Sequence, residues 1–166
     1  MPPLVAAMIS LGVLGAIDTY LTATILPLPV FVTFIAWASF FACGGGQEGF
    51  VKSLARNFTG IVIASLSLIV IEIAPAHPVI AAISVGVGTS AMVWASSIPL
   101  LSFPPAIVFG FASLVATSVA TGKPVLTGDL SQPTLVAAAA MLLGAAFGYA
   151  SEVGTNMLAA KKPAAA

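Results

Sequence analysis

Long stretches without a charged side chain constrain the fold of this chain more strongly than any motif in it. One of them, residues 60–71, is mostly apolar and does not alternate between apolar and polar positions. Only 6% of the residues are charged and 60% are hydrophobic, whereas a soluble domain carries about 25% charged residues. Because so few charges cannot cover a water-exposed surface, the sequence predicts an integral membrane protein. The missing alternation argues against a transmembrane β-barrel.

The apolar sequence divides into about six membrane spans. A spanning helix takes about 20 residues, and 166 residues hold about six of them once connections are allowed for. Prolines disfavour helix at the residue before them and mark several of the breaks. We therefore predict one transmembrane domain, an all-α polytopic helix bundle. Its helices are expected at residues 4–22, 29–43, 53–73, 79–97, 106–120 and 134–149, with a flexible tail at residues 151–166.

Residues 41–57 form the one interior stretch in which three charged side chains, Glu48, Lys52 and Arg56, lie close together. We interpret the stretch as a hairpin between the second and third helices. Short loops rich in Lys and Arg stay on the cytoplasmic side of a membrane. With six spans this hairpin shares a side with both termini, which places Lys52, Arg56, Lys161 and Lys162 on one side and Lys123 on the other. Both termini are therefore predicted to be cytoplasmic.

Two kinds of internal repeat are compatible with six spans. Trp37-Ala38-Ser39, Trp94-Ala95-Ser96 and Tyr149-Ala150-Ser151 recur at spacings of 57 and 55 residues, which would suit three helical hairpins in tandem. The alternative is an inverted three-plus-three repeat, a common transporter design. We find no sequence match in favour of the inverted repeat.

Asp18 is the strongest candidate for a functional residue in the apolar sequence. A charged side chain at the middle of a bilayer costs roughly 2.5–3.5 kcal/mol, so it is expected to face the bundle interior or water. Tyr20 and Thr22 belong to the densest cluster of hydroxyl groups in the chain. Thr22 follows Asp18 by four residues and so shares a helix face with it. Hydration near the periplasmic helix end is the simpler interpretation of Asp18.

Asn57 and Glu72 complete the predicted substrate-binding residues. A buried amide is costly unless it is hydrogen-bonded, so Asn57 should either join two helices or line a path for solute. Glu72 could meet His77 across the following turn, or both could simply be solvated. Asp18, Glu72 and Asp129 all fall toward the predicted periplasmic side. An acidic outer mouth of this kind would disfavour anions.

Other site classes lack the residues they need. One cysteine and one histidine exclude an internal disulfide, a cysteine metal cluster and a site with two histidine ligands. We expect no catalytic residues, no cofactor, no metal and no enzyme activity, and without a basic patch no nucleic-acid partner. The expected partners are the lipid bilayer and a small-molecule solute. Ala140, Gly144 and Gly148 form a stripe of small residues that could pack within the chain or join it to a second copy in a homo-oligomer.

Several short motifs resemble the YcdZ-like family of small, uncharacterised bacterial inner-membrane proteins. They are Gly15-Ala16-Ile17, Phe41-Ala42-Cys43 with the following glycines and Gly49, Leu101-Ser102-Phe103-Pro104, and Phe147-Gly148-Tyr149-Ala150. The resemblance runs from about Leu11 to Leu158. It implies a multi-pass protein of the bacterial inner (plasma) membrane and suggests transport. That family supplies no catalytic or binding residues, and an aromatic residue can stand in it where this chain has Asp18.

Three functional hypotheses follow from these features. The first is a channel or facilitator for a small neutral solute of the size of urea, an amide, an alcohol or a weak acid. The second is a proton- or cation-coupled transporter that uses Asp18 and Glu72. The third is an accessory membrane subunit without transport of its own. Solute-dependent swelling of liposomes would favour the first, and a strict need for a pH gradient would favour the second.

Overall fold

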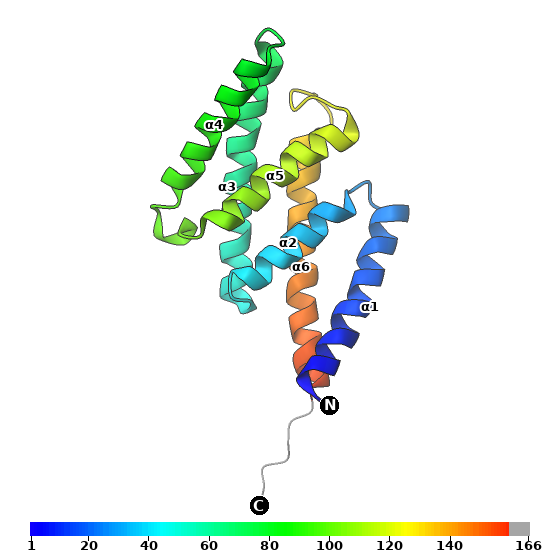
Figure 1. Ribbon diagram of the computed structural model, residues 1–166. Helices are drawn as coiled ribbons and strands as arrows, with labels where there is room; N and C mark the ends of the chain where they lie inside the picture. Colours follow the sequence, from blue (N-terminus) through cyan, green and yellow to red (C-terminus); the bar gives the residue numbers. More distant parts are fainter. Residues whose placement is uncertain (160–166) are drawn as a thin grey trace, which may run out of the picture.

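The computed structural model describes residues 1–159, and all regular structure in that range is helical (Figure 1). Five of the helices are long and apolar enough to cross a membrane, while the apolar α2 has only 13 residues. The predicted all-α polytopic bundle is confirmed. The elements are α1 (Pro3–Thr24), α2 (Val30–Ala42), α3 (Gly46–Ile73), α4 (Pro78–Ala95), the 3₁₀ helix η1 (Pro99–Leu101), α5 (Pro104–Thr121) and α6 (Pro133–Leu158).

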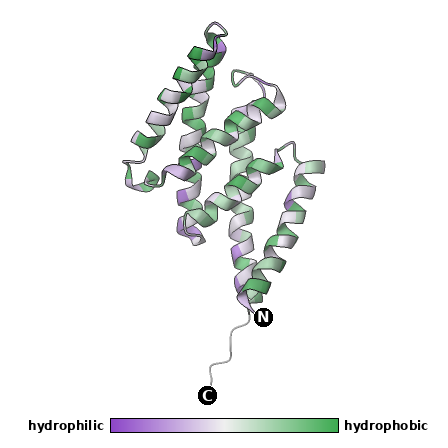
Figure 2. Ribbon diagram, in the orientation of Figure 1, coloured by the Kyte–Doolittle hydropathy of each residue, from purple (hydrophilic) through white to green (hydrophobic). Residues whose placement is uncertain are grey.

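The outer surface of the bundle is apolar. Figure 2 shows hydrophobic residues on every helix, and large side chains such as Leu66, Val87 and Val119 are exposed. Such a surface is unsuited to water and suits lipid. The helices therefore contact a bilayer.

Prolines set the start of most helices. The first residue of α1, α4, η1, α5 and α6 is a proline, and α2 begins directly after Pro29. Proline fits the first helical turn because its missing N–H would have no partner there and its φ is already helical. These prolines account for the accuracy of most predicted helix starts.

Two predicted boundaries are wrong, and both corrections lengthen a helix. α3 begins at Gly46 and not at Ser53, because a tight turn with positive φ at Gly44, Gly45 and Gly46 needs very few residues. The carboxylate of Glu152 also accepts a hydrogen bond from the Gly46 N–H at 2.6 Å and so caps the helix. α6 continues to Leu158, so residues 151–158 are helical. The remainder of the predicted tail, residues 160–166, lies outside the described residues.

Two long helices, α3 and α6, form the centre of the bundle (Figure 1). α5 packs across α3, and α2 packs across α6. The outer helices α4 and α1 lie on the far sides of α3 and α6. Both ends of the described chain lie together, with the amino group of Met1 3.4 Å from the carbonyl oxygen of Leu158.

The two halves of the chain have the same arrangement but opposite directions. α1 packs on α6 as α4 packs on α3, and α2 packs on α6 as α5 packs on α3. In Figure 1, α1 and α3 run upward while α4 and α6 run downward. An odd number of helices in each half turns the second half over in the membrane. The fold is therefore an inverted three-plus-three repeat.

Two equivalent hydrogen bonds show which residues correspond. Ser10 Oγ in α1 donates to the carbonyl oxygen of Ser151 at 2.9 Å. Ser84 Oγ in α4 donates to the carbonyl oxygen of Ser67, also at 2.9 Å. Residues of α1 thus correspond to residues 74 positions later (84 − 10), and residues of α3 to residues 84 positions later (151 − 67).

Two close helix crossings give the same correspondence. A Cβ atom on Gly144 would lie 2.0 Å from the carbonyl oxygen of Thr33, where α6 crosses α2. A Cβ atom on Gly60 would lie 1.9 Å from the carbonyl oxygen of Ile107, where α3 crosses α5. These pairs again differ by 74 and 84 positions. The extra ten residues of the second half lie in the longer α5 and the α5–α6 connection.

The inverted repeat is also visible in the sequence, contrary to our expectation. Ala7, Ile9, Ser10, Gly12 and Val13 of α1 recur as Ala81, Ile83, Ser84, Gly86 and Val87 of α4. The suggested tandem repeat of three helical hairpins is wrong. Trp37 is 5% exposed and lies on α2, whereas Trp94 is 77% exposed and lies on α4, a helix that corresponds to α1.

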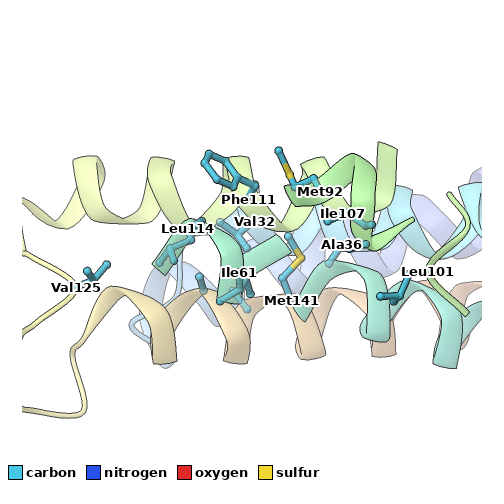
Figure 3. Packing of buried hydrophobic residues seen from close by; sticks show 14 residues of the cluster. Val32, Ala36, Ile61, Met92, Leu101, Ile107, Phe111, Leu114, Val125 and Met141 are labelled. Carbon is cyan, nitrogen blue, oxygen red and sulfur yellow. The ribbon is translucent and has the colours of Figure 1, made fainter. Parts of the chain in front are cut away.

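An apolar cluster fills the region where the four inner helices meet. Figure 3 shows Val32 of α2, Ile61 of α3, Ile107 and Leu114 of α5 and Met141 of α6 among its members. All five side chains are almost completely buried. The polar groups described below lie in the same inner helices or against them.

Candidate functional site

Asp18 is fully buried and bonded to a threonine. It lies on α1, where its Oδ2 atom is 2.5 Å from the Thr33 hydroxyl of α2. The same hydroxyl lies 2.7 Å from the carbonyl oxygen of Val30. Within residues 1–159, Asp18 Oδ1 has no hydrogen-bond partner. The simpler interpretation, a hydrated carboxylate at a helix end, is wrong.

Asn57 lies at the crossing of α2, α3 and α5. Its Oδ1 atom accepts a hydrogen bond from the Ser39 hydroxyl of α2 at 3.0 Å, and both residues are fully buried. α5 passes so close that a Cβ atom on Gly110 would lie 1.8 Å from the Asn57 carbonyl oxygen. In the described chain no group bonds to Asn57 Nδ2 or to the buried hydroxyl of Ser113, about one turn along α5 from Gly110. The Asn57 oxygen therefore joins α3 to α2, while the Asn57 nitrogen is a donor without a partner among the described residues.

The second half of the repeat has apolar residues where the first half has these polar ones. By the correspondence above, Asp18 matches Met92 (18 + 74) and Thr33 matches Ile107 (33 + 74). Asn57 matches Met141 (57 + 84). These apolar counterparts are all buried as well. Equivalent packing is therefore achieved without polar groups, so Asp18, Thr33 and Asn57 are not required by the packing.

The hydroxyls of Ser39 and Ser113 are equivalent positions in the two halves (39 + 74). Ser39 donates to Asn57, whereas the counterpart of Asn57 is Met141, which offers no oxygen. This difference gives a physical reason for the unsatisfied hydroxyl of Ser113.

Arg56 joins two connections at the end of the bundle that holds both termini. Its side chain is 5% exposed, and Nε donates to the carbonyl oxygen of Leu100 at 3.0 Å. Nη1 donates to the Sγ atom of Cys43 at 3.2 Å, and the guanidinium lies 5.7 Å from the centre of the Phe103 ring. Among residues 1–159 the one ion pair is between Lys52 and Glu48, so Arg56 has no carboxylate partner there.

Glu72 is not part of a site with Asp18 or His77. Its carboxylate accepts hydrogen bonds from the N–H groups of Val125 at 2.6 Å and Leu126 at 3.2 Å. His77 instead caps α4 by accepting from the Val79 N–H. Glu72 therefore holds the α5–α6 connection against the end of α3, and the suggested pairing with His77 is wrong.

We predict that Glu72→Gln destabilises the α5–α6 connection. A neutral amide is a weaker acceptor than a carboxylate, so the loss should be about 1–2 kcal/mol. Faster amide hydrogen exchange at Val125 and Leu126 would measure it. Glu48→Gln is the control because Glu48 is exposed and bonds only to Lys52 among the described residues, and it should leave exchange at these amides unchanged. Equal exchange in the Glu72 variant and the wild type would contradict the assignment.

The remaining predicted residues lie elsewhere. Tyr20 is 65% exposed on the outer surface. The Thr22 hydroxyl donates to the backbone oxygen of Asp18 at 2.8 Å and does not bond the carboxylate. Asp129 lies in the α5–α6 connection. Its carboxylate accepts hydrogen bonds from the Ser131 hydroxyl and the Ser131 N–H, and these bonds, the hydroxyl's most of all, lower the pKa of the Asp129 carboxyl. Of the five predicted binding residues, Asp18 and Thr22 are neighbours on α1, while Tyr20, Asn57 and Glu72 lie elsewhere.

The stripe of Ala140, Gly144 and Gly148 is used inside the chain. All three residues are buried, and α2 occupies the surface they form. A Cβ atom on Gly148 would lie 2.8 Å from the Phe40 ring. The suggestion that this stripe joins two copies of the chain is therefore wrong.

Sequence reasoning missed Thr33, Ser39 and Ser113, because isolated hydroxyls on apolar helices are common. The alignment of the two halves would have identified Ser39 and Ser113 as a conserved pair within the chain. No cluster of three or more metal-ligating side chains occurs in residues 1–159.

Comparison with known proteins relates nearly the whole bundle to one family. Residues 8–156 match a family model described as "Protein of unknown function (DUF1097)". A stretch of 31 residues is 52% identical to the "Uncharacterized protein YahC" of Escherichia coli (strain K12) and spans 19% of this chain and 19% of that protein. No solved structure matches the chain. The matched residues include all or most of each α-helix.

Proposed function

Because this chain belongs to the DUF1097 family of proteins of unknown function, we propose its function from its own residues: it is a membrane facilitator or channel for a small neutral solute. Suitable solutes have the size of urea, a short amide, a small alcohol or a weak acid. The observation that carries the proposal is the inverted repeat with unsatisfied polar groups buried in its inner helices. A closer relation to YcdZ-like proteins is part of the proposal.

Inverted repeats support a transport function because their binding sites lie near the bilayer midplane, where the two halves meet. Asn57 lies where the two halves meet, since it contacts α2 of its own half and α5 of the other half. Its free Nδ2 donor and the free hydroxyl of Ser113 could both bond a solute. Because both groups are fully buried, the described conformation corresponds to a closed state.

The chemistry of this crossing favours a neutral solute. The polar groups contributed by Asn57, Ser39 and Ser113 are an amide and two hydroxyls, none of which is charged at neutral pH. An amide donor and hydroxyls match the carbonyl and amino groups of urea or a short amide. Burying an ion beside them would cost far more than these hydrogen bonds return.

The grooves on the outer surface are poorer candidates for a solute site. A groove of about 460 Å³ between α3 and α4 is lined almost entirely by apolar side chains, including Ile63, Leu66 and Ile83. A small polar solute would lose its hydration there without new hydrogen bonds. The α2–α3–α5 crossing is therefore the proposed path.

We further propose that the protein lies in the bacterial inner membrane with both termini cytoplasmic. Lys52 and Arg56 lie in the part of α3 nearest the termini, and Lys123 lies in the α5–α6 connection at the opposite end. Lys161 and Lys162, which the prediction also used, fall outside the described residues. Basic residues near short loops favour the cytoplasmic side.

The two other hypotheses receive less support. A coupled transporter that uses Asp18 and Glu72 together would need both carboxylates in one site, but Glu72 bonds the α5–α6 connection. An accessory subunit would need a free docking stripe, but α2 already covers Ala140, Gly144 and Gly148. The proposal includes no catalytic step.

We predict that Asn57→Met lowers solute permeability about tenfold. Methionine is the residue that the second half carries at this position, so the variant should fold while losing the hydrogen bonds of the amide. A tenfold decrease corresponds to a loss of about 1.4 kcal/mol in the free energy of solute binding. The measurement is osmotic swelling of liposomes that contain the protein, with urea, acetamide and glycerol as solutes.

The control is Thr89→Val, because the Thr89 hydroxyl is exposed and bonds only within α4. It should swell like the wild type. If wild-type liposomes swell no faster than protein-free liposomes for any of these solutes, the proposed function is wrong. If wild-type liposomes swell faster than protein-free liposomes but the Asn57 variant swells like the wild type, the site is wrong and the function stands.

A further inference from the structure

The surroundings of Asp18 suit a neutral carboxylic acid better than a carboxylate. The Thr33 hydroxyl lies between two oxygen atoms, Asp18 Oδ2 at 2.5 Å and the carbonyl oxygen of Val30 at 2.7 Å. A hydroxyl carries one hydrogen. If Asp18 were ionised, that hydrogen would have to serve both acceptors. If Asp18 is protonated, its own hydrogen bonds Thr33 Oγ1, and the threonine hydrogen bonds Val30.

No positive charge faces Asp18 from the helices that pack against it. On α1 the other ionisable side chain is Tyr20, which points outward. Among residues of α2, Val30–Ala42, none is ionisable. α6 carries Tyr149, which packs on Phe40 and Phe50, and Glu152, which bonds Gly46 near the opposite end of the bundle. An isolated buried carboxylate is very costly, and the usual outcome is that the group binds a proton.

The second half of the repeat shows that Asp18 serves no packing requirement. Its counterpart is Met92, which is 4% exposed, and the counterpart of Thr33 is Ile107. A carboxyl–hydroxyl pair in place of two apolar side chains adds a group that can gain or lose a proton. Intramembrane carboxyl groups of this kind mark proton relays and pathways.

We infer that Asp18, with Thr33, is a proton-binding site in which the carboxyl group is held neutral at the contact between α1 and α2. Release of the proton leaves the carboxylate on Asp18 and transfers H⁺ to water, which requires α1 to move away from α2. The site therefore couples the charge of Asp18 to the position of α1. This inference does not depend on the proposed transport of a neutral solute.

Infrared spectroscopy of the full chain in lipid bilayers tests the inference directly. At neutral pH the wild type should show the C=O absorption of a protonated carboxylic acid, which shifts in D₂O and is absent in Asp18→Asn. Glu72→Gln should retain the absorption, because Glu72 is a separate group at the α5–α6 connection. Absorption by an ionised Asp18 carboxylate at neutral pH would overturn the inference.

A second variant, Asp18→Met, separates a proton site from a structural anchor. Methionine reproduces the second half, and replacing a buried ionisable group by a packed apolar one is often neutral or stabilising. We expect a melting temperature no lower than that of the wild type, together with loss of the carboxylic-acid absorption. A clearly lower melting temperature would mean that the Asp18–Thr33 bond holds the fold together, and it would count against the inference.

Discussion

Replacing Gly60 or Gly144 by alanine should destabilise the protein by about 3 kcal/mol or more. At each position a Cβ atom would lie about 2 Å from a backbone carbonyl oxygen of the crossing helix, 1.9 Å for Gly60 and 2.0 Å for Gly144. A flexible side chain could turn away, but a backbone oxygen within a helix cannot. α3 and α5, or α6 and α2, would have to separate. Thermal unfolding in detergent micelles measures the effect.

The repeat provides the matched controls for this experiment. Gly12 and Gly86 are also equivalent positions, and a Cβ atom on either meets nothing within 4 Å. Alanine at these positions should leave the melting temperature unchanged or raise it slightly, because alanine favours helix over glycine. If the Gly60 and Gly144 variants melt like the Gly12 and Gly86 variants, the close crossings are not present in the protein.

Replacing Arg56 by alanine should cost about 3 kcal/mol. The substitution removes two hydrogen bonds from a charged donor, to Leu100 and Cys43, and the contact with Phe103. It also releases the α2–α3 turn from the α4–α5 connection. Lysine retains the charge but lacks the planar, multi-donor guanidinium, so Arg56→Lys should recover only part of the loss. The melting temperature in detergent measures both variants.

Lys52→Ala is the control for the arginine variants. Lys52 precedes Arg56 by one helical turn but bonds only the exposed Glu48 among the described residues. An exposed pair of this kind contributes little to stability. If loss of Arg56 is no more harmful than loss of Lys52, the guanidinium does not join the two connections.

The sequence predicted the helices well, because composition and proline positions act locally. Scarce charges required a membrane, and prolines directly before α2 and at the first residue of α4, α5 and α6 marked where these helices begin. The glycine turn was harder to place. Glu48, Lys52 and Arg56 suggested a long polar hairpin, although positive φ at three glycines closes the turn at once and leaves the charges on a helix.

The partners of the candidate residues could not be predicted, because they depend on contacts between distant segments. Asp18 was identified by the cost of its charge, but Thr33 as its partner follows from how α1 and α2 fold back. Glu72 was likewise identified as a charged side chain in an apolar sequence, but its carboxylate bonds Val125 in the α5–α6 connection, 53 residues away. The small-residue stripe of α6 predicted close packing correctly, yet only the fold showed that α2 is its partner.

The opposed halves have a consequence for biogenesis. A unit of three helices that packs against an upside-down copy of itself fits the bilayer equally well either way up, so its shape gives the insertion machinery no preferred direction. Direction must then come from residues that differ between the halves. Lys52 and Arg56 have the uncharged counterparts Val136 and Ala140 (52 + 84 and 56 + 84), so these two cations are the features of the described chain best placed to determine which face of the membrane receives the first half.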